Sequence, residues 1–176
     1  MTVFERISYT VWCWIASRQE KNEALIKAAG EGKLEDAEFL LARGARINAK
    51  GLWQNRPVHE AAWHGRMEML EFLLAAGARV DSMGVSGMQP LHIAAMRNDK
   101  EMVEALLAHD APVSSLDYNG KMPGELCKDL GVWMLIHEAE KEVEKRAVLA
   151  QEREALAGFW KQRRKLGGMR PPAPRL

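Results

Sequence analysis

The sequence predicts an all-α protein built as a solenoid of stacked helix pairs. Its columns repeat at a spacing of 33 residues, as from Pro57 to Pro90 and to Pro123. Apolar residues inside each unit follow helical spacing, and prolines and glycines stand at fixed places between the expected helices. One such unit cannot bury both of its faces, whereas about three stacked units can, so the repeat itself predicts the architecture.

The repeat is visible in several columns at once, which is stronger evidence than any single motif. The recurring residues are the prolines 57, 90 and 123, the histidines 59 and 92, the alanine pairs 28–29, 61–62 and 94–95, the leucine pairs 40–41, 73–74 and 106–107, the glutamates 35, 68 and 101, and the Gly-Ala pairs 44–45 and 77–78.

The second unit shows why each column is occupied as it is. We expect a first helix over about 56–64 and a second over about 67–75. Proline is tolerated in the first turn because the N–H it lacks would have no partner there. The alanine pair lets a neighbouring helix approach closely. Gly65 permits the reversal between the two helices, and Gly77 ends the second in the left-handed conformation.

This pattern resembles the ankyrin repeat, whose units begin with Thr-Pro-Leu-His and continue with Ala-Ala, Leu-Leu and Gly-Ala. The corresponding helix starts read "RPVHEAA" and "QPLHIAA", and the resemblance covers residues 23–138. Arg56 and Gln89 stand where the family has threonine, so the family's hydroxyl bond to the histidine cannot form. Three units are implied, over roughly 23–50, 51–83 and 84–116. A degenerate fourth unit from about residue 117 serves as a cap.

Two arms flank the predicted repeats. Residues 1–22 are expected to form an amphipathic helical arm, which either caps the first repeat, docks onto a partner or lies in a membrane interface. Its low basic charge makes the membrane alternative weaker. It is too short to span a bilayer and has no basic segment ahead of an apolar run, so we expect neither a transmembrane span nor a secretory signal.

The C-terminal arm is predicted to be a long charged helix over 139–166, followed by an extended basic tail over 167–176. Ile136, Val143, Ala150 and Ala157 recur at seven residues, but Arg146 and Arg153 make a poor coiled-coil seam. The end of this arm combines aromatic and basic residues that could contact RNA or an acidic protein groove, or could simply be solvated. These candidate contact residues are Phe159, Trp160, Lys161, Arg163, Arg164, Lys165, Arg170 and Arg175.

No catalytic or metal-binding pattern appears in the sequence, so we expect neither an enzyme nor a cofactor or metal site. His59 and His92 belong to the repeat and are expected to bond local backbone. A formal net charge of +1 argues against bulk attraction to nucleic acid or membrane. Cys13 and Cys127 are far apart, which suggests reduced thiols inside a cell, in the cytoplasm or an organelle, and not a secreted protein.

The resemblance implies that a partner binds the concave side of the stack, on the finger loops and on the exposed face of each first helix. The implied finger positions are Lys50, Leu52, Trp53, Asn55, Met83, Val85, Ser86, Met88, Leu116, Tyr118, Asn119 and Lys121. The implied helix positions are Gly30, Glu31, Trp63, His64, Met96 and Arg97. These positions are unusually apolar for exposed turns, which favours an interaction site over side chains that fold back onto neighbouring repeats. We interpret Trp63 as a partner anchor.

The sequence therefore predicts a non-enzymatic protein–protein interaction scaffold, an accessory or structural subunit of a larger assembly. Two alternatives remain open: a ribonucleoprotein subunit attached to RNA through its basic tail, and a peripheral membrane adaptor that uses its N-terminal helix. A homo-oligomer is not predicted.

Overall fold

The computed structural model describes residues 16–165, and within that range the chain is helical and contains no strand. Contacts separate two compact units, Met1–His137 and Glu138–Leu176. The α-helices are α2 (Arg18–Glu31), α3 (Leu34–Ala42), α4 (Pro57–Trp63), α5 (Met67–Ala75), α6 (Pro90–Arg97), α7 (Lys100–Ala108), α8 (Pro123–Leu126) and α9 (Leu130–Lys165). Two short 3₁₀ helices, η1 (Leu52–Gln54) and η2 (Val85–Gly87), lie in the loops between helix pairs.

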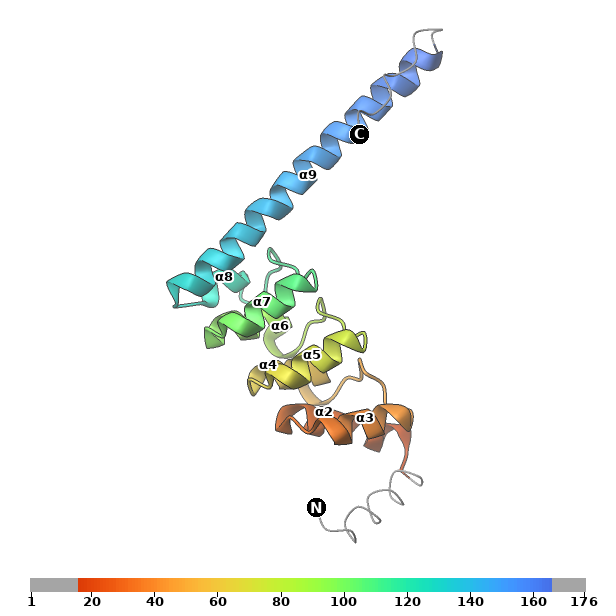
Figure 1. The fold of residues 1–176 in the computed structure, drawn as a ribbon, viewed down its shortest axis with the longest axis vertical. Coiled ribbons are helices and arrows are strands. Elements are labelled where there is room, and N and C mark those ends of the chain that lie inside the picture. Colours follow the sequence, from red (N-terminus) through yellow and green to blue (C-terminus); the bar gives the residue numbers. More distant parts are fainter. Residues whose placement is uncertain (1–15, 166–176) are drawn as a thin grey trace. The chain divides into compact units, whose positions relative to one another are not determined.

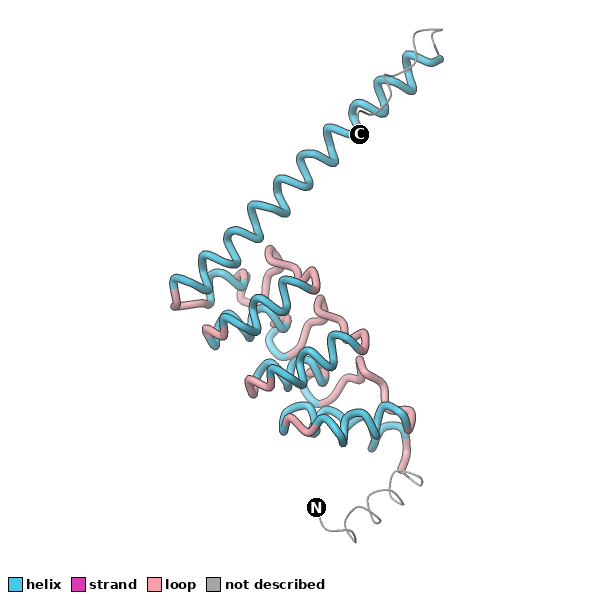
Figure 2. Tube along the Cα trace, in the orientation of Figure 1, coloured by secondary structure: helices cyan, strands magenta, loops and turns pink. Residues whose placement is uncertain are grey.

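The compact unit Met1–His137 contains a stack of helix pairs (Figure 1). Helix α4 packs between α2 and α6, and α6 also contacts α8, so the first helices of successive pairs form one layer. Helices α3, α5 and α7 each pack on the first helix of their own pair. The long loops between pairs, here called fingers, follow one edge of the stack, and the short turns within pairs follow the opposite edge (Figure 2). The predicted solenoid is thus confirmed for the described part of the chain.

The core is the apolar residues that meet between the two layers of the stack. The alanine pairs of α2, α4 and α6 are buried, which confirms that small side chains allow the first helices to approach closely. The largest side chains with no exposed surface include Leu25, Leu40, Leu70, Leu73, Leu91, Ile93, Leu106 and Ile136. Burying a side chain of this size stabilises the fold by about 1.5–3 kcal/mol, so the stack depends mainly on apolar burial.

The two repeat histidines do more than the local capping that the sequence predicts. The backbone N–H of Arg56 donates to Nδ1 of His59 at 3.2 Å, as expected for a residue near a helix start. Nε2 of His59 therefore carries the proton and donates to the carbonyl of Ser82 in the next finger at 2.9 Å. Nε2 of His92 lies 3.2 Å from the carbonyl of Lys121 in the same way. Each histidine thus ties its helix pair to the following finger.

The first helix of the stack begins at Arg18, whereas we had expected the repeats to begin at residue 23. The reason is a capping box: Oγ of Ser17 accepts from the N–H of Glu20 at 3.3 Å, and the Glu20 carboxylate accepts from the N–H of Ser17 at 2.7 Å. Residues 18–22 therefore belong to α2. The rest of the predicted arm, residues 1–15, lies outside the described residues.

The long C-terminal helix is confirmed, but it begins at Leu130, within the range predicted for the repeats. Helix α8 is short because the chain turns to an extended conformation at Cys127, which is only partly buried. Oδ1 of Asn98 then accepts from the N–H groups of Lys128 and Asp129 at 2.7 and 2.8 Å. The carboxylate of Asp129 accepts from the N–H of Val132 at 3.0 Å, which satisfies a free donor in the first turn of α9.

Candidate partner-binding groove

A cavity of about 820 Å³ lies between α2, α4 and the finger that contains η1. We call it the first groove, because the first two helix pairs form it. Its lining residues are Glu23, Ile26, Lys27, Gly30, Glu31, Gly51, Leu52, Trp53, Asn55, Glu60, His64 and Arg66. The structure therefore brings together six of the predicted binding positions: Gly30, Glu31, Leu52, Trp53, Asn55 and His64.

The finger at the edge of this groove presents two large apolar side chains to solvent. Leu52 is 86% exposed and Trp53 is 78% exposed. The N–H of Gly51 donates to the carbonyl of Asn55 at 2.8 Å, which closes the finger into a tight turn. A Cβ atom at Gly51 would lie 2.7 Å from Cδ1 of Ile26, so the finger approaches the Ile26 side chain of α2 closely at this glycine. The tight turn thus fixes the backbone position of the exposed residue Trp53.

The backbone of this finger is strained at two successive residues, whereas the next finger is strained at one, Ser86, whose φ is 56°. Trp53 and Gln54 have φ values of 59° and 64°, in the left-handed region. The fingers of the next two units have Gly87 and Gly120 in the column of Gln54, with φ values of 73° and 75°. A residue with a Cβ in this conformation costs roughly 1–2 kcal/mol relative to the right-handed region. Strain of this kind concentrates at binding and active sites.

The floor of the groove is a hydrogen-bonded cluster. Nδ2 of Asn55 donates to the Glu60 carboxylate at 2.9 Å, and Nε2 of His64 lies 3.7 Å from the other Glu60 oxygen. Oδ1 of Asn55 accepts from the N–H of Val85 in the next finger at 2.9 Å. Both ends of the Asn55 side chain are therefore committed inside the protein. Its part in the groove is to hold two fingers together, although the sequence predicts a partner contact.

Charged side chains form one rim of the groove. Lys27 and Lys33 approach the Glu31 carboxylate to 3.9 and 2.6 Å, and the Lys33 ammonium is the main reason that the pKa of Glu31 is lowered. Nε of Arg66 donates to the carbonyl of Gly30 at 3.1 Å, which fastens the second helix pair to the first. The groove therefore combines an apolar finger with a mixed-charge rim.

Trp63 is not among the residues that line the groove. It is the last residue of α4 and is partly buried. Its carbonyl accepts from Nη1 of Arg97 at 2.7 Å. The Arg97 guanidinium also lies over Gly65, where an added Cβ would come within 2.5 Å of Nη2. Both residues thus take part in joining the second and third helix pairs, and nothing in their placement distinguishes Trp63 as a partner anchor.

The other predicted positions are spread along the stack. Met83, Met96, Leu116 and Tyr118 are exposed, whereas Val85 and Met88 are partly buried. The Tyr118 ring packs on Gly87, and its N–H donates to the carbonyl of Ser86 at 3.0 Å. Lys50, Gly51 and Leu52 line a second hollow of about 650 Å³ together with residues of the first turns of α2. Asn119 and Lys121 donate their backbone N–H groups to the Asp117 carboxylate at 2.8 and 2.9 Å.

The sequence prediction missed six groove residues: Glu23, Ile26, Lys27, Gly51, Glu60 and Arg66. Helical spacing could have found two of them. Ile26 precedes Gly30 by one helical turn, and Glu60 precedes His64 by one turn, so each shares a face with a predicted residue. Arg66 reaches the groove by the length of its side chain, which no spacing rule predicts.

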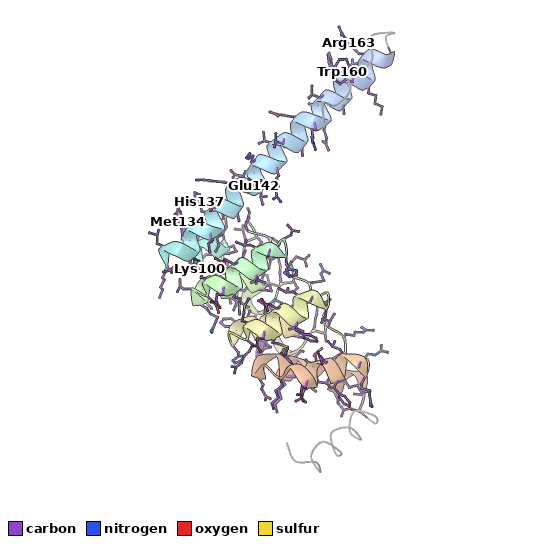
Figure 3. The ribbon with its side chains drawn as sticks, in the orientation of Figure 1. Lys100, Met134, His137, Glu142, Trp160 and Arg163 are labelled. Carbon is purple, nitrogen blue, oxygen red and sulfur yellow. The ribbon has the colours of Figure 1, made fainter. Side chains whose placement is uncertain are left out.

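The candidate contacts of the C-terminal arm lie in the last turns of α9, where Figure 3 labels Trp160 and Arg163. The rings of Phe159 and Trp160 meet edge to face with centroids 5.4 Å apart. The Arg163 guanidinium lies 5.6 Å from the centroid of the Phe159 ring. Lys161 is exposed. Arg164 and Lys165 close the helix, and Arg170 and Arg175 lie outside the described residues.

Over residues 16–165 the structure shows no helix that is long and apolar enough to cross a membrane. The same part of the chain contains no cluster of His, Cys, Asp and Glu side chains suited to hold a metal ion.

Comparison with known families agrees with the stacked helix pairs. A family model for ankyrin repeats in three copies matches residues 58–144, and a second model, for ankyrin repeats in many copies, matches residues 25–74. No curated protein matches the chain. The two matched ranges overlap and together cover residues 25–144, which include the described helix pairs of the stack apart from the first half of α2. Ankyrin repeats are typically non-catalytic modules for protein–protein interaction, and this chain belongs to the ankyrin-repeat family.

Proposed function

We propose that this protein is a non-enzymatic scaffold that binds a partner protein through the first groove, as an accessory subunit of a larger assembly. The observation that carries the proposal is the exposure of Leu52 and Trp53 on a strained finger beside a cavity of about 820 Å³. Exposed apolar side chains that surround a hollow usually mark an interaction site.

The chemistry of the groove suits a polypeptide segment. Trp53 and Leu52 offer an apolar edge, Glu60 offers a carboxylate on the floor, and Lys27 and Glu31 offer charges of both signs on the rim. Tryptophan is among the residues most often found to dominate binding energy. The hydrogen bond from Gly51 to Asn55 fixes the backbone of the turn at Trp53 before a partner arrives, which reduces the backbone entropy lost on binding.

Affinity capture with the full chain from its native source, read by quantitative mass spectrometry, tests this proposal. We expect the double variant Leu52→Ala/Trp53→Ala to lose partners by about tenfold or more, since truncating a binding hot spot costs roughly 2 kcal/mol. Leu130→Ala/Trp133→Ala is the matched control, because these are also an exposed leucine and tryptophan, and they lie outside the groove and outside the predicted binding positions. Equal recovery by wild type and the double variant would refute the groove as the binding site.

A further inference from the structure

The second half of α9 bears a regular stripe of arginines and apolar residues. The spacing between its members alternates between three and four residues, which is the spacing of a coiled-coil seam. At about 100° per residue these positions fall within about 100° of the helix circumference, and they extend for about 25 Å along it. We call this set the arginine–leucine stripe; its members are Arg146, Leu149, Arg153, Leu156, Trp160 and Arg163.

The apolar members of the stripe are open to solvent. Leu149 is 50% exposed and Leu156 is 58% exposed. A shallow hollow of about 580 Å³ lies on this face and is lined by four stripe residues together with Ala150 and one carboxylate, that of Glu152. All of these residues belong to the compact unit Glu138–Leu176, whereas the first groove belongs to the compact unit Met1–His137. Regularly spaced apolar residues on an exposed helix face mark a surface for another helix.

The arginines of the stripe are available for a partner. Nε of Arg146 lies 3.4 Å from the Glu142 carboxylate, but both side chains are more than half exposed, so this pair contributes little. Arg153 forms no ion pair with any residue in the range 16–165. Arg163 lies over the Phe159 ring and is exposed. Three positive charges therefore alternate with the apolar residues on one face.

We propose that the arginine–leucine stripe binds an amphipathic helix of a partner protein that is acidic where it meets the arginines. Such a helix would place carboxylates opposite Arg146, Arg153 and Arg163 and apolar side chains opposite the two leucines. Arginine is suited to this role because its planar guanidinium matches a carboxylate in a two-point contact. The charge pattern, and not only the apolar face, determines the partner.

Two other occupants fit the stripe less well. A parallel pair of copies of this chain would place like-charged arginines opposite one another at the seam, which is destabilising. RNA would pair its phosphates with the arginines but would leave Leu149 and Leu156 without apolar partners. The set predicted from a seven-residue recurrence, Ile136, Val143, Ala150 and Ala157, lies on a different face of α9 and contains two small alanines.

The test uses the full chain and two synthetic peptide helices of equal length. Both peptides carry leucine at one seam position of each heptad, and the other seam position is glutamate in one peptide and lysine in the other. Fluorescence anisotropy measures each affinity at low and at high salt. We expect the glutamate peptide to bind about tenfold more tightly, and this preference to weaken in high salt.

Charge reversal sharpens the test. The double variant Arg146→Glu/Arg153→Glu is expected to lose the glutamate peptide and to gain the lysine peptide. A gain cannot result from misfolding, so this outcome supports the proposal directly. The matched control is Lys141→Glu/Lys161→Glu, which changes the net charge equally at exposed positions outside the stripe. It should keep the preference for the glutamate peptide.

Four outcomes would overturn the proposal. The first is equal affinity for both peptides, and the second is the same loss in the control double variant. The third is unchanged affinity after Leu149→Ala/Leu156→Ala. The fourth is evidence for another occupant. A dimer in sedimentation that the arginine variants abolish would assign the stripe to a second copy of the chain. Binding of a single-stranded oligouridine in place of the peptide would assign it to RNA.

Discussion

Acidification is expected to destabilise this stack through His59. The His59 side chain has no exposed surface, and both ring nitrogens are bonded: Nδ1 accepts from the N–H of Arg56 and Nε2 donates to the carbonyl of Ser82. Burial is the main cause that lowers the pKa of His59 to about 4, and the nearby Arg56 charge lowers it further. Protonation would place a second N–H on Nδ1, directly opposite the N–H of Arg56, so the charged ring does not fit.

The size of the effect follows from proton linkage. The pKa of His59 is about 4 in the folded protein, against an ordinary value of 6.5 that we assign to the unfolded chain. Above pH 6.5 the ring is neutral in both states and pH has no effect through this group. As the pH falls from 6.5 towards 4, the unfolded chain binds the proton first, and unfolding is favoured. The loss reaches about 2 kcal/mol at pH 5 and about 3 kcal/mol near pH 4. Burial also lowers the pKa of His92, which acts in the same direction.

Urea unfolding at pH 7.5, 6 and 5 measures this loss as a decrease in the free energy of unfolding. The His59→Gln variant is expected to be less stable than the wild type at every pH. Its free energy of unfolding, however, should decrease between pH 7.5 and pH 5 by about 2 kcal/mol less than that of the wild type. The ring proton resonances of His59 should not titrate above pH 5 in NMR spectra. A His59 ring that titrates near pH 6.5, or a pH dependence that His59→Gln leaves unchanged, would refute the reasoning.

Four further substitutions test the packing by urea denaturation. Gly87→Ala should lower the free energy of unfolding by about 2 kcal/mol or more, because the new Cβ meets the Tyr118 ring and residue 87 has a φ of 73°. Gly120→Ala is the control: residue 120 has a φ of 75° but open space around it, so this change should cost only about 1 kcal/mol. Equal costs for the two variants would contradict the contact with Tyr118. Leu106→Ala should cost about 3 kcal/mol by leaving a cavity, and a cost below 1 kcal/mol would show that the site collapses freely. Asn98→Ala should cost about 2 kcal/mol, because two backbone N–H groups before α9 lose their acceptor, and an unchanged stability would show that water replaces it.

The helix pairs were largely predictable because their limits depend on local chemistry. Proline fixes the first turn of α4 and Gly77 follows the end of α5, so the predicted ranges agree with the observed ones to within a residue. The capping box at Ser17 is also local, and it could have placed the start of α2 correctly. The strain in the finger of Trp53 and Gln54 was less visible. Only the glycines in the column of Gln54, in the other fingers, reveal that this position requires a left-handed conformation.

The site was harder to predict because each repeat position acquires its role from neighbouring repeats. The columns marked Asn55 as a free finger residue, but Glu60 and Val85 take up both ends of its amide. Trp63 occupies a column open to binding, and its backbone carbonyl accepts a bond from Arg97, which lies in the column of His64 in the next repeat. The period identifies equivalent positions, and only the three-dimensional contacts show which of them remain free.

The bonds from His59 to Ser82 and from His92 to Lys121 make the stack a one-dimensional chain of couplings, in which each repeat is stabilised only by its immediate neighbours. The first groove is built on the coupling between the first two described helix pairs, through α2 and α4. A ligand seated there would bridge these two pairs and add its binding free energy to that coupling. Occupancy of the groove should then be visible beyond the lining residues, as slower amide hydrogen exchange throughout α2 and in α3, which does not line the groove.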